Sequence, residues 1–186
     1  MPLTLPLPIL TDRTEIRLVE ERDLPDLLAV NGDDEATRFL PYESWRSMED
    51  AQAWLLRMKS FQDSGVALQF VIVERQSNIA IGTCLLFKYD EASARADIGY
   101  VLGRRFWRQG YAREALRALI AHAFHTQGVR RLEAEVHTHN EPSNNLIVQL
   151  GFSREGVLRQ RYVSKGEIRD INIYGLLKDE YTTPIA

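Results

Sequence analysis

The sequence predicts one mixed α/β (α+β) domain with about seven strands and four helices. Three observations lead to this fold class. The chain has 186 residues, which suits one domain with a real core and is short for two. Apolar residues change repeatedly between strand-like and helical spacing, in the order strand, two helices, three strands, helix, strand, helix, two strands. No low-complexity linker and no internal repeat divides the chain, so we assign residues 1–186 to a single domain.

The N-terminal part begins with an extended arm. Residues 1–10 are apolar but carry three prolines and no basic segment, so we expect neither a signal peptide nor a membrane span. A short strand is expected over 16–19 and a helix over 24–30. A longer helix is expected over 47–58, where Ser47 is the predicted N-cap.

The middle of the chain alternates between strand and helix patterns. Residues 68–73 and 79–87 are rich in β-branched and aromatic side chains, and the polar turn between them predicts a hairpin. A further strand is expected over 94–102. The apolar period then becomes helical over 111–126, and Gly128 is expected to end that helix.

The C-terminal part repeats the alternation on a smaller scale. A strand is expected over 132–137 and a short helix over 142–150, with Pro142 in its first turn. Two strands, 152–163 and 168–177, are expected to form a hairpin around a tight turn.

Composition excludes several function classes. The net charge is −3, with 26% charged and 45% hydrophobic residues, so we expect no nucleic-acid partner. No segment reaches the ~18 apolar residues of a membrane span, and we expect a cytoplasmic protein. The single cysteine, Cys84, cannot form a disulfide within the chain and lies in an apolar run, where we expect a buried, inert thiol.

The most informative segment is the turn over 104–113, between an expected strand and the long helix. A helix N-terminus exposes unpaired N–H groups, and the small residues Gly110 and Ala112 would let an anion approach them. The segment adds four cations: Arg104, Arg105, Arg108 and Arg113. Neither the P-loop motif nor the dinucleotide motif G-x-G-x-x-G is present. Composition alone therefore leaves two readings open, a phosphate site and a solvated basic turn.

The same segment resembles a family motif. Residues 107–112 (WRQGYA) resemble the [Gln/Arg]-x-x-Gly-x-[Gly/Ala] turn with which the GNAT superfamily of N-acetyltransferases binds acetyl-CoA. The Trp at the first position departs from the general motif, but together with residues 98–102 (IGYVL) it is similar to the branch of the RimJ/RimL ribosomal-protein acetyltransferases. Residues 140–145 (NEPSNN) and 150–152 (LGF) are similar to a second motif of that branch. The resemblance covers nearly the whole chain.

The resemblance implies a GNAT fold, with a mixed, mostly antiparallel, twisted sheet, and it implies acetyl-CoA as cosubstrate. Backbone groups of one strand would line the pantetheine arm and polarise the acetyl carbonyl: Tyr100, Val101 and Leu102. N–H groups of the turn would hold the pyrophosphate: Arg108, Gln109, Gly110, Tyr111, Ala112 and Arg113. Asn140 would hydrogen-bond the pantetheine, and Asn145 would also contact the cofactor. For Asn140 the alternative role is a helix cap.

Acetyl transfer to an amine needs a group that takes a proton from the amine and one that gives a proton to the leaving thiolate. Asp97 is the first candidate base, against a solvent-facing strand charge as the alternative. Tyr162 lies near a position where some members of the branch carry a glutamate, and Glu43 and Glu133 are weaker candidates. Many GNAT enzymes have a tyrosine on the short helix that acts as the general acid, and the corresponding position here is Ile147. Ser143 is therefore the candidate acid, against an ordinary first-turn serine.

These expectations define one principal function and several rivals. The principal one is an acetyl-CoA-dependent N-acetyltransferase that works by direct attack in a ternary complex, with the α-amine of a protein N-terminus as the acceptor that the resemblance suggests. A small amine (a polyamine, amino acid or antibiotic) is the alternative acceptor. A non-catalytic acyl-CoA sensor and a nucleotide-binding protein are rivals from other classes. We expect no metal site, since the histidine pairs lack further ligands, and the sequence leaves a homodimer open.

Overall fold

The computed structural model describes residue 3 and residues 8–182. The expected arm over 1–10 lies mostly outside these residues. The strands are β1 (Ile9–Leu10), β2 (Thr14–Leu18), β3 (Leu68–Glu74), β4 (Ile79–Asp90), β5 (Arg95–Leu102), β6 (Arg131–His137), β7 (Ser153–Ser164) and β8 (Glu167–Leu177). The helices are α1 (Leu24–Asn31), α2 (Met48–Asp63), α3 (Tyr111–His125) and α4 (Glu141–Gln149).

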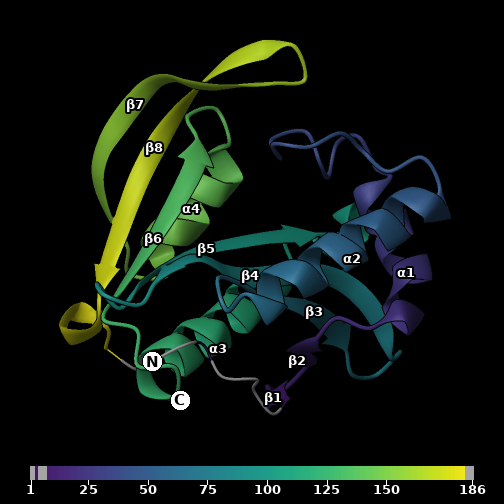
Figure 1. Cartoon of the computed structure of the whole chain (residues 1–186), viewed down its shortest axis with the longest axis horizontal. Helices are drawn as coiled ribbons and strands as arrows, with labels where there is room; N and C mark the ends of the chain where they lie inside the picture. The colour runs from purple at the N-terminus through teal and green to yellow at the C-terminus, as the bar shows by residue number, and fades with distance from the viewer. Residues whose placement is uncertain (1–2, 4–7, 183–186) are drawn as a thin grey trace.

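All eight strands form one sheet in the order β1-β2-β3-β4-β5-β6-β8-β7. Each neighbouring pair is antiparallel except β5 and β6, which are parallel because α3 carries the chain back between them. The expected α/β class with four helices and a mostly antiparallel sheet is confirmed (Figure 1). The strand beyond the expected seven is β1, which lies at the end of the predicted arm and pairs with β2.

Two cores form on the two faces of the sheet, because successive strand residues point to opposite faces. On β3, Phe70 and Ile72 face one core, whereas Val71 and Val73 face the other. The first core is closed by α3 and α4 and the second by α1 and α2. The second core reaches only β3 and β4, so the same face of β6, β8 and β7 has no helix over it among the described residues (Figure 1).

Helix α2 is longer than predicted, since it continues beyond residue 58 to Asp63. The last turn is largely exposed, so apolar periodicity gives no signal there. The helix ends only before Gly65, which has a φ of 72°.

The feature that positions the site is an opening between β5 and β6. Their pairing covers only residues 95–97 of β5 with residues 131–133 of β6. Beyond these pairs β5 stays with β4 as far as Leu102, and β6 stays with β8 as far as His137, so the two strands diverge (Figure 1). We call the space between residues 98–102 and 134–137 the open wedge. In the described chain no strand covers the facing edges of the wedge, so backbone N–H and C=O groups there can bind a ligand.

Candidate active site

The turn that follows β5 ends in an uncapped helix start. Gly110 precedes α3 with a φ of 84°, and no described side chain caps the first turn of the helix. Arg108 also has a positive φ, of 58°. A left-handed residue at this point turns the chain sharply, and the free N–H groups of the first turn and the helix dipole favour an anion.

This turn is held from both sides. The indole nitrogen of Trp107 donates to the carbonyl oxygen of Leu102 at 2.7 Å. From the other side the Arg13 guanidinium donates to Glu114 Oε2 at 2.7 Å and to the Gln109 carbonyl at 3.0 Å. The guanidinium carbon also lies 4.4 Å from the centre of the Tyr111 ring. Arg13 was not predicted as a site residue, because it lies about a hundred positions from its partner in the sequence.

The arginines of the turn divide into two groups. Arg104 pairs with Asp33 at 3.0 Å and is therefore directed toward α1. Arg105, Arg108 and Arg113 are exposed, and none of them has a carboxylate partner in the described part of the chain. Three cations thus remain available to an anionic ligand near the start of α3.

Tyr100 and Ser143 meet across the wedge. Tyr100 lies on the part of β5 that is no longer paired with β6, and Ser143 lies in the first turn of α4. The tyrosine hydroxyl donates to Ser143 Oγ at 3.1 Å. Burial raises the pKa of Tyr100, and the hydrogen bond to Ser143 partly opposes this rise. Val101 and Leu102, which follow on β5, have buried side chains. Only their backbone is therefore available for the predicted contacts with a ligand.

Asn140 and Asn145 occupy different surroundings. The side-chain oxygen of Asn140 accepts a hydrogen bond from the Ser143 N–H at 3.3 Å, which is the helix-cap role considered above. Asn145 is exposed on the outer surface of α4.

The neighbouring Asn144, which the sequence did not single out, holds α4 in place. Its amide nitrogen donates to the carbonyl oxygens of His137 at 3.0 Å and Asn140 at 2.8 Å. Its oxygen accepts from Asn172 Nδ2 at 2.8 Å and from the Tyr174 hydroxyl at 2.7 Å. The end of β6, the start of α4 and β8 are therefore joined through one side chain. In the sequence, only the pair of asparagines in the NEPSNN motif pointed to this role of Asn144.

Asp97 lies at the apex of the wedge, in the last β5–β6 pair. Its side chain is buried, with 2% of the residue exposed, so it is not the solvent-facing strand charge considered as the alternative. Lys88 Nζ donates to it at 2.8 Å and Arg95 at 3.3 Å. Burial raises the pKa of Asp97, and the bond from Lys88 opposes that rise.

Glu135 is a second carboxylate near this apex. Lys88 donates to it at 2.9 Å as well, so Lys88 joins Asp97 and Glu135. The Glu135 side chain keeps 24% exposure and lies on β6 beyond the last β5–β6 pair. Lys88 has a φ of 49° at an irregularity in β4, which aims its side chain at both carboxylates. No sequence pattern indicates Glu135, because the irregularity of β4 is what brings Lys88 to it.

The remaining candidate bases differ in their surroundings. The Glu133 carboxylate binds Arg95 at 2.7 Å and Arg131 at 2.8 Å. Burial alone would raise the pKa of Glu133, but these arginines outweigh it and lower the pKa. Tyr162 is half-buried on β7, where burial and the charge of Glu135 raise its pKa. Glu43 is exposed and distant from this group in the described contacts.

The segment between α1 and α2 is fastened to the tip of the β7–β8 hairpin. Lys165 Nζ donates to the Thr37 carbonyl at 2.8 Å, and Ser164 Oγ donates to the Leu40 carbonyl at 3.1 Å. We call these two contacts the clasp. In Figure 1 both segments lie at the upper side of the molecule, beyond the open ends of β5 and β6. The segment between α1 and α2 and the hairpin that carries Tyr162 therefore meet.

The tryptophans of that region belong to the core. Trp45 and Trp54 are each 6% exposed, and their ring centres lie 5.2 Å apart. Trp54 belongs to α2 itself, and both rings pack in the core that α1 and α2 close.

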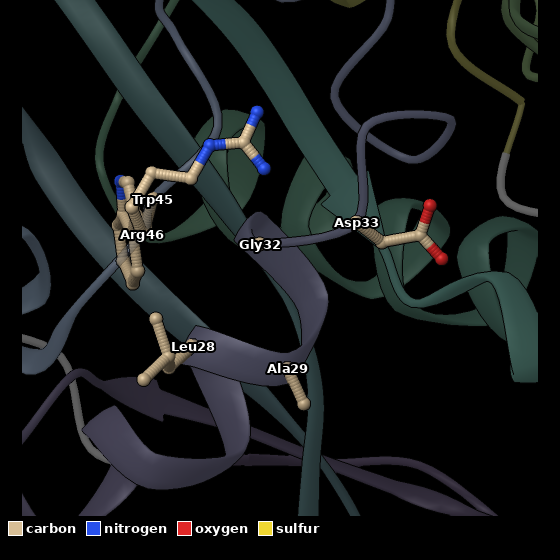
Figure 2. Close-up of a pocket in the computed structure, with 6 residues that line it drawn as sticks. All are labelled: Leu28, Ala29, Gly32, Asp33, Trp45 and Arg46. Carbon is tan, nitrogen blue, oxygen red and sulfur yellow. The ribbon is translucent and has the colours of Figure 1, made fainter.

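Figure 2 shows a shallow pocket of about 490 Å³ at the end of α1. It is lined by Leu28, Ala29, Gly32, Asp33, Trp45 and Arg46. A second hollow of about 470 Å³ reaches residues 103–106 from the same side. Neither pocket includes a residue of the wedge, so the candidate site is defined by the diverging strands and the polar groups between them.

Metal and redox chemistry have few candidate residues. Within residues 8–182 no three His, Cys, Asp or Glu side chains gather in a way that would hold a metal ion. Cys84 is fully buried, and burial raises the pKa of its thiol. No helix among the described residues is both long and apolar enough to cross a bilayer.

Comparison with known proteins agrees with this architecture. Residues 13–153 match the family described as Acetyltransferase (GNAT) domain. An uncharacterized N-acetyltransferase, p20 of Bacillus licheniformis, is 33% identical over 92% of this chain and 96% of its own length. The [Ribosomal protein uS5]-alanine N-acetyltransferase of Escherichia coli is 30% identical over 92% of this chain and 91% of its own. One similar solved structure is that of RimL, a ribosomal L7/L12 alpha-N-protein acetyltransferase, in complex with coenzyme A. It superposes on this chain with a TM-score of 0.85 and 22% identity, and the match covers 94% of this chain and 100% of RimL.

Proposed function

The chain belongs to the GNAT acetyltransferase family, and on that premise we propose that it moves an acetyl group from acetyl-CoA to a primary amine. The observation that carries the proposal is the continuity between the open wedge and the uncapped start of α3. An unpaired strand edge suits the amides of a pantetheine arm, and a free helix N-terminus suits a pyrophosphate.

The residues of the donor side fit such a molecule. A Cβ atom added to Gly110 would have one described neighbour within 4 Å, the Arg13 guanidinium at 3.3 Å, so little of the described chain covers this backbone where the phosphates would lie. The N–H groups of residues 108–113 would hold the pyrophosphate, with the exposed arginines as further cations. The backbone of Tyr100, Val101 and Leu102 would bind the pantetheine, and Asn140 and Asn145 are the remaining candidate contacts.

The acceptor side would lie on the face of the wedge without a helix, beside Asp97 and Glu135. An incoming amine must be neutral to attack, so a carboxylate or a water that it holds has to take the proton. Asp97 has the raised pKa that suits a base, but Lys88 and Arg95 surround it. Glu135 is more accessible than Asp97. Both carboxylates bind Lys88, so protonation of either one changes the net charge of the cluster of Asp97, Glu135 and Lys88. Tyr162 would contact the acceptor as a neutral phenol.

Direct attack of the amine on the thioester needs no covalent enzyme intermediate. The nitrogen forms the new C–N bond, the C–S bond breaks, and the thiolate takes a proton. Ser143 is the proposed proton donor, at the positive end of α4.

We propose a protein N-terminal α-amine as the acceptor. The relative from Escherichia coli is named for an alanine of ribosomal protein uS5, and RimL is named as an alpha-N-protein acetyltransferase. A small amine is the second candidate. The clasp favours it, because a bridge at the open end of the wedge limits the size of what can enter.

The decisive experiment measures thiol release from acetyl-CoA with a panel of N-terminal peptides and small amines, together with thermal stabilisation by CoA. Stabilisation by CoA without thiol release on any amine would identify a sensor instead of an enzyme. Stabilisation by ATP or NAD and none by CoA would contradict the whole proposal.

Gly110→Glu tests the donor side, because it places a carboxylate and bulk among the free N–H groups. Gly128→Glu is the matched control, since Gly128 follows the other end of α3 with a φ of 70° and open space around it. Both variants strain the backbone by roughly 1–2 kcal/mol. We expect only Gly110→Glu to abolish stabilisation by CoA, and equal CoA binding by both variants would refute the assignment.

A further inference from the structure

We propose that Tyr100 is a positioning residue that fixes the direction of the Ser143 proton. This inference rests on the proposed function, and it assigns a task to the Tyr100 side chain beyond the backbone contacts considered above. Its basis is the hydrogen bond of 3.1 Å between the two hydroxyls, formed where β5 has already left β6.

A serine hydroxyl has one proton and two acceptor lone pairs, and it rotates freely unless a neighbour fixes it. Tyr100 donates its proton to Ser143 Oγ and so occupies one lone pair. The Ser143 proton must then point away from Tyr100. Among the described residues no acceptor receives that proton, so it remains available to an acceptor that enters the wedge.

The surroundings keep this arrangement rigid. The Ser143 backbone N–H is bound to Asn140 Oδ1, and the first turn of α4 is tied to β6 and β8 through Asn144. Tyr100 is partly buried, and burial raises its pKa, so its hydroxyl keeps its proton at neutral pH. A protonated phenol can donate, and the geometry of the pair makes Tyr100 the donor.

The consequence concerns the leaving group. When the C–S bond breaks, a negative charge develops on sulfur, and a donor already aimed at it needs no reorientation. Without Tyr100 the Ser143 hydroxyl could turn its proton elsewhere, and part of its effect on the sulfur would be lost.

The test compares Tyr100→Phe, Ser143→Ala and the double variant. The first keeps the ring and its packing and removes only the hydroxyl. We expect it to lower kcat about ten-fold with little change in the KM for acetyl-CoA, and Ser143→Ala to lower kcat at least as much. In the Ser143→Ala background the loss of the Tyr100 hydroxyl should have no further effect. Tyr181→Phe, outside the wedge and packed on Phe124, controls for a general effect of losing a phenol.

A second readout does not depend on turnover. The thiol pKa of bound CoA, followed by the ultraviolet absorbance of the thiolate, should rise in Tyr100→Phe and in Ser143→Ala, and by no more in the double variant. If the pattern holds while no amine is acetylated, the proposed function fails and the Tyr100 assignment stands. Unchanged kcat and thiol pKa in Tyr100→Phe would overturn the assignment. So would a double variant whose loss of kcat is the product of the losses in the two single variants.

Discussion

At the scale of single residues, the site depends on side chains that meet from distant parts of the chain. Arg13 and Glu114 are separated by 101 positions, and their contact fixes the start of α3 against the β1–β2 turn. Burial alone would raise the pKa of Glu114, but hydrogen bonds from Thr11 and Arg13 outweigh it and lower the pKa below the ordinary 4.5. The ionised carboxylate is therefore the form that stabilises the turn.

This shift predicts a pH-dependent loss of stability in Glu114→Gln. A carboxyl with a lowered pKa in the folded state stabilises the protein above its unfolded pKa, and the effect is lost as the pH falls through the folded value. We expect Glu114→Gln to lower the free energy of unfolding by about 1 kcal/mol at pH 7, because Arg13 is partly exposed. The difference from the parent should disappear in acid, below pH 4.5. Urea titrations across this range measure it, with exposed Glu21→Gln as control, and a difference independent of pH would contradict the explanation.

At the scale of elements, the sequence predicts the parts better than their junctions. The apolar stripe of α3 and the hairpin of β3 and β4 follow from periodicity, because those residues respond mainly to local spacing. The divergence of β5 from β6 could not be predicted, because the strand-like residue pattern of each continues unchanged beyond their last pair, at Asp97. Lys88, Glu135 and Asn144 were missed for the same reason: their roles arise from contacts between elements.

The clasp is the junction that we propose to act on acceptor binding. Removing the Lys165 side chain takes away its bond to the Thr37 carbonyl, so the α1–α2 segment and the hairpin tip can separate. We expect Lys165→Ala to change the KM of the acceptor several-fold and to leave the KM of acetyl-CoA unchanged, because the donor turn lies elsewhere. Steady-state kinetics measure both constants, with the exposed Lys59→Ala on α2 as control. A change confined to acetyl-CoA would show that the clasp has no part in acceptor binding.

At the scale of the whole molecule, the sheet consists of two halves that are joined by the short β5–β6 pairing. In the half from β1 to β5, α3 covers one face of the sheet, and α1 and α2 cover the other face at β3 and β4. In the half made of β6, β8 and β7, helix α4 covers one face, and no helix of the described chain covers the other. The proposed donor site would take its groups from both halves: the edge of β5 and the start of α3 from one, and the start of α4 from the other. A ligand in the wedge would therefore bridge parts that the sheet itself joins at only one end.

This arrangement predicts where CoA will protect the backbone from hydrogen exchange. N–H groups that have no partner exchange fast, and a ligand that accepts their hydrogen bonds slows the exchange. We expect CoA to slow exchange at residues 98–102 and 111–113, and to leave β2 and β3 unchanged, because those strands are already paired on both sides. Gly110→Glu should lose the protection at both wedge and turn, since the ligand binds them as one. Protection at the turn alone would mean that the phosphates bind without the pantetheine entering between β5 and β6, and the wedge would then lose its assigned role.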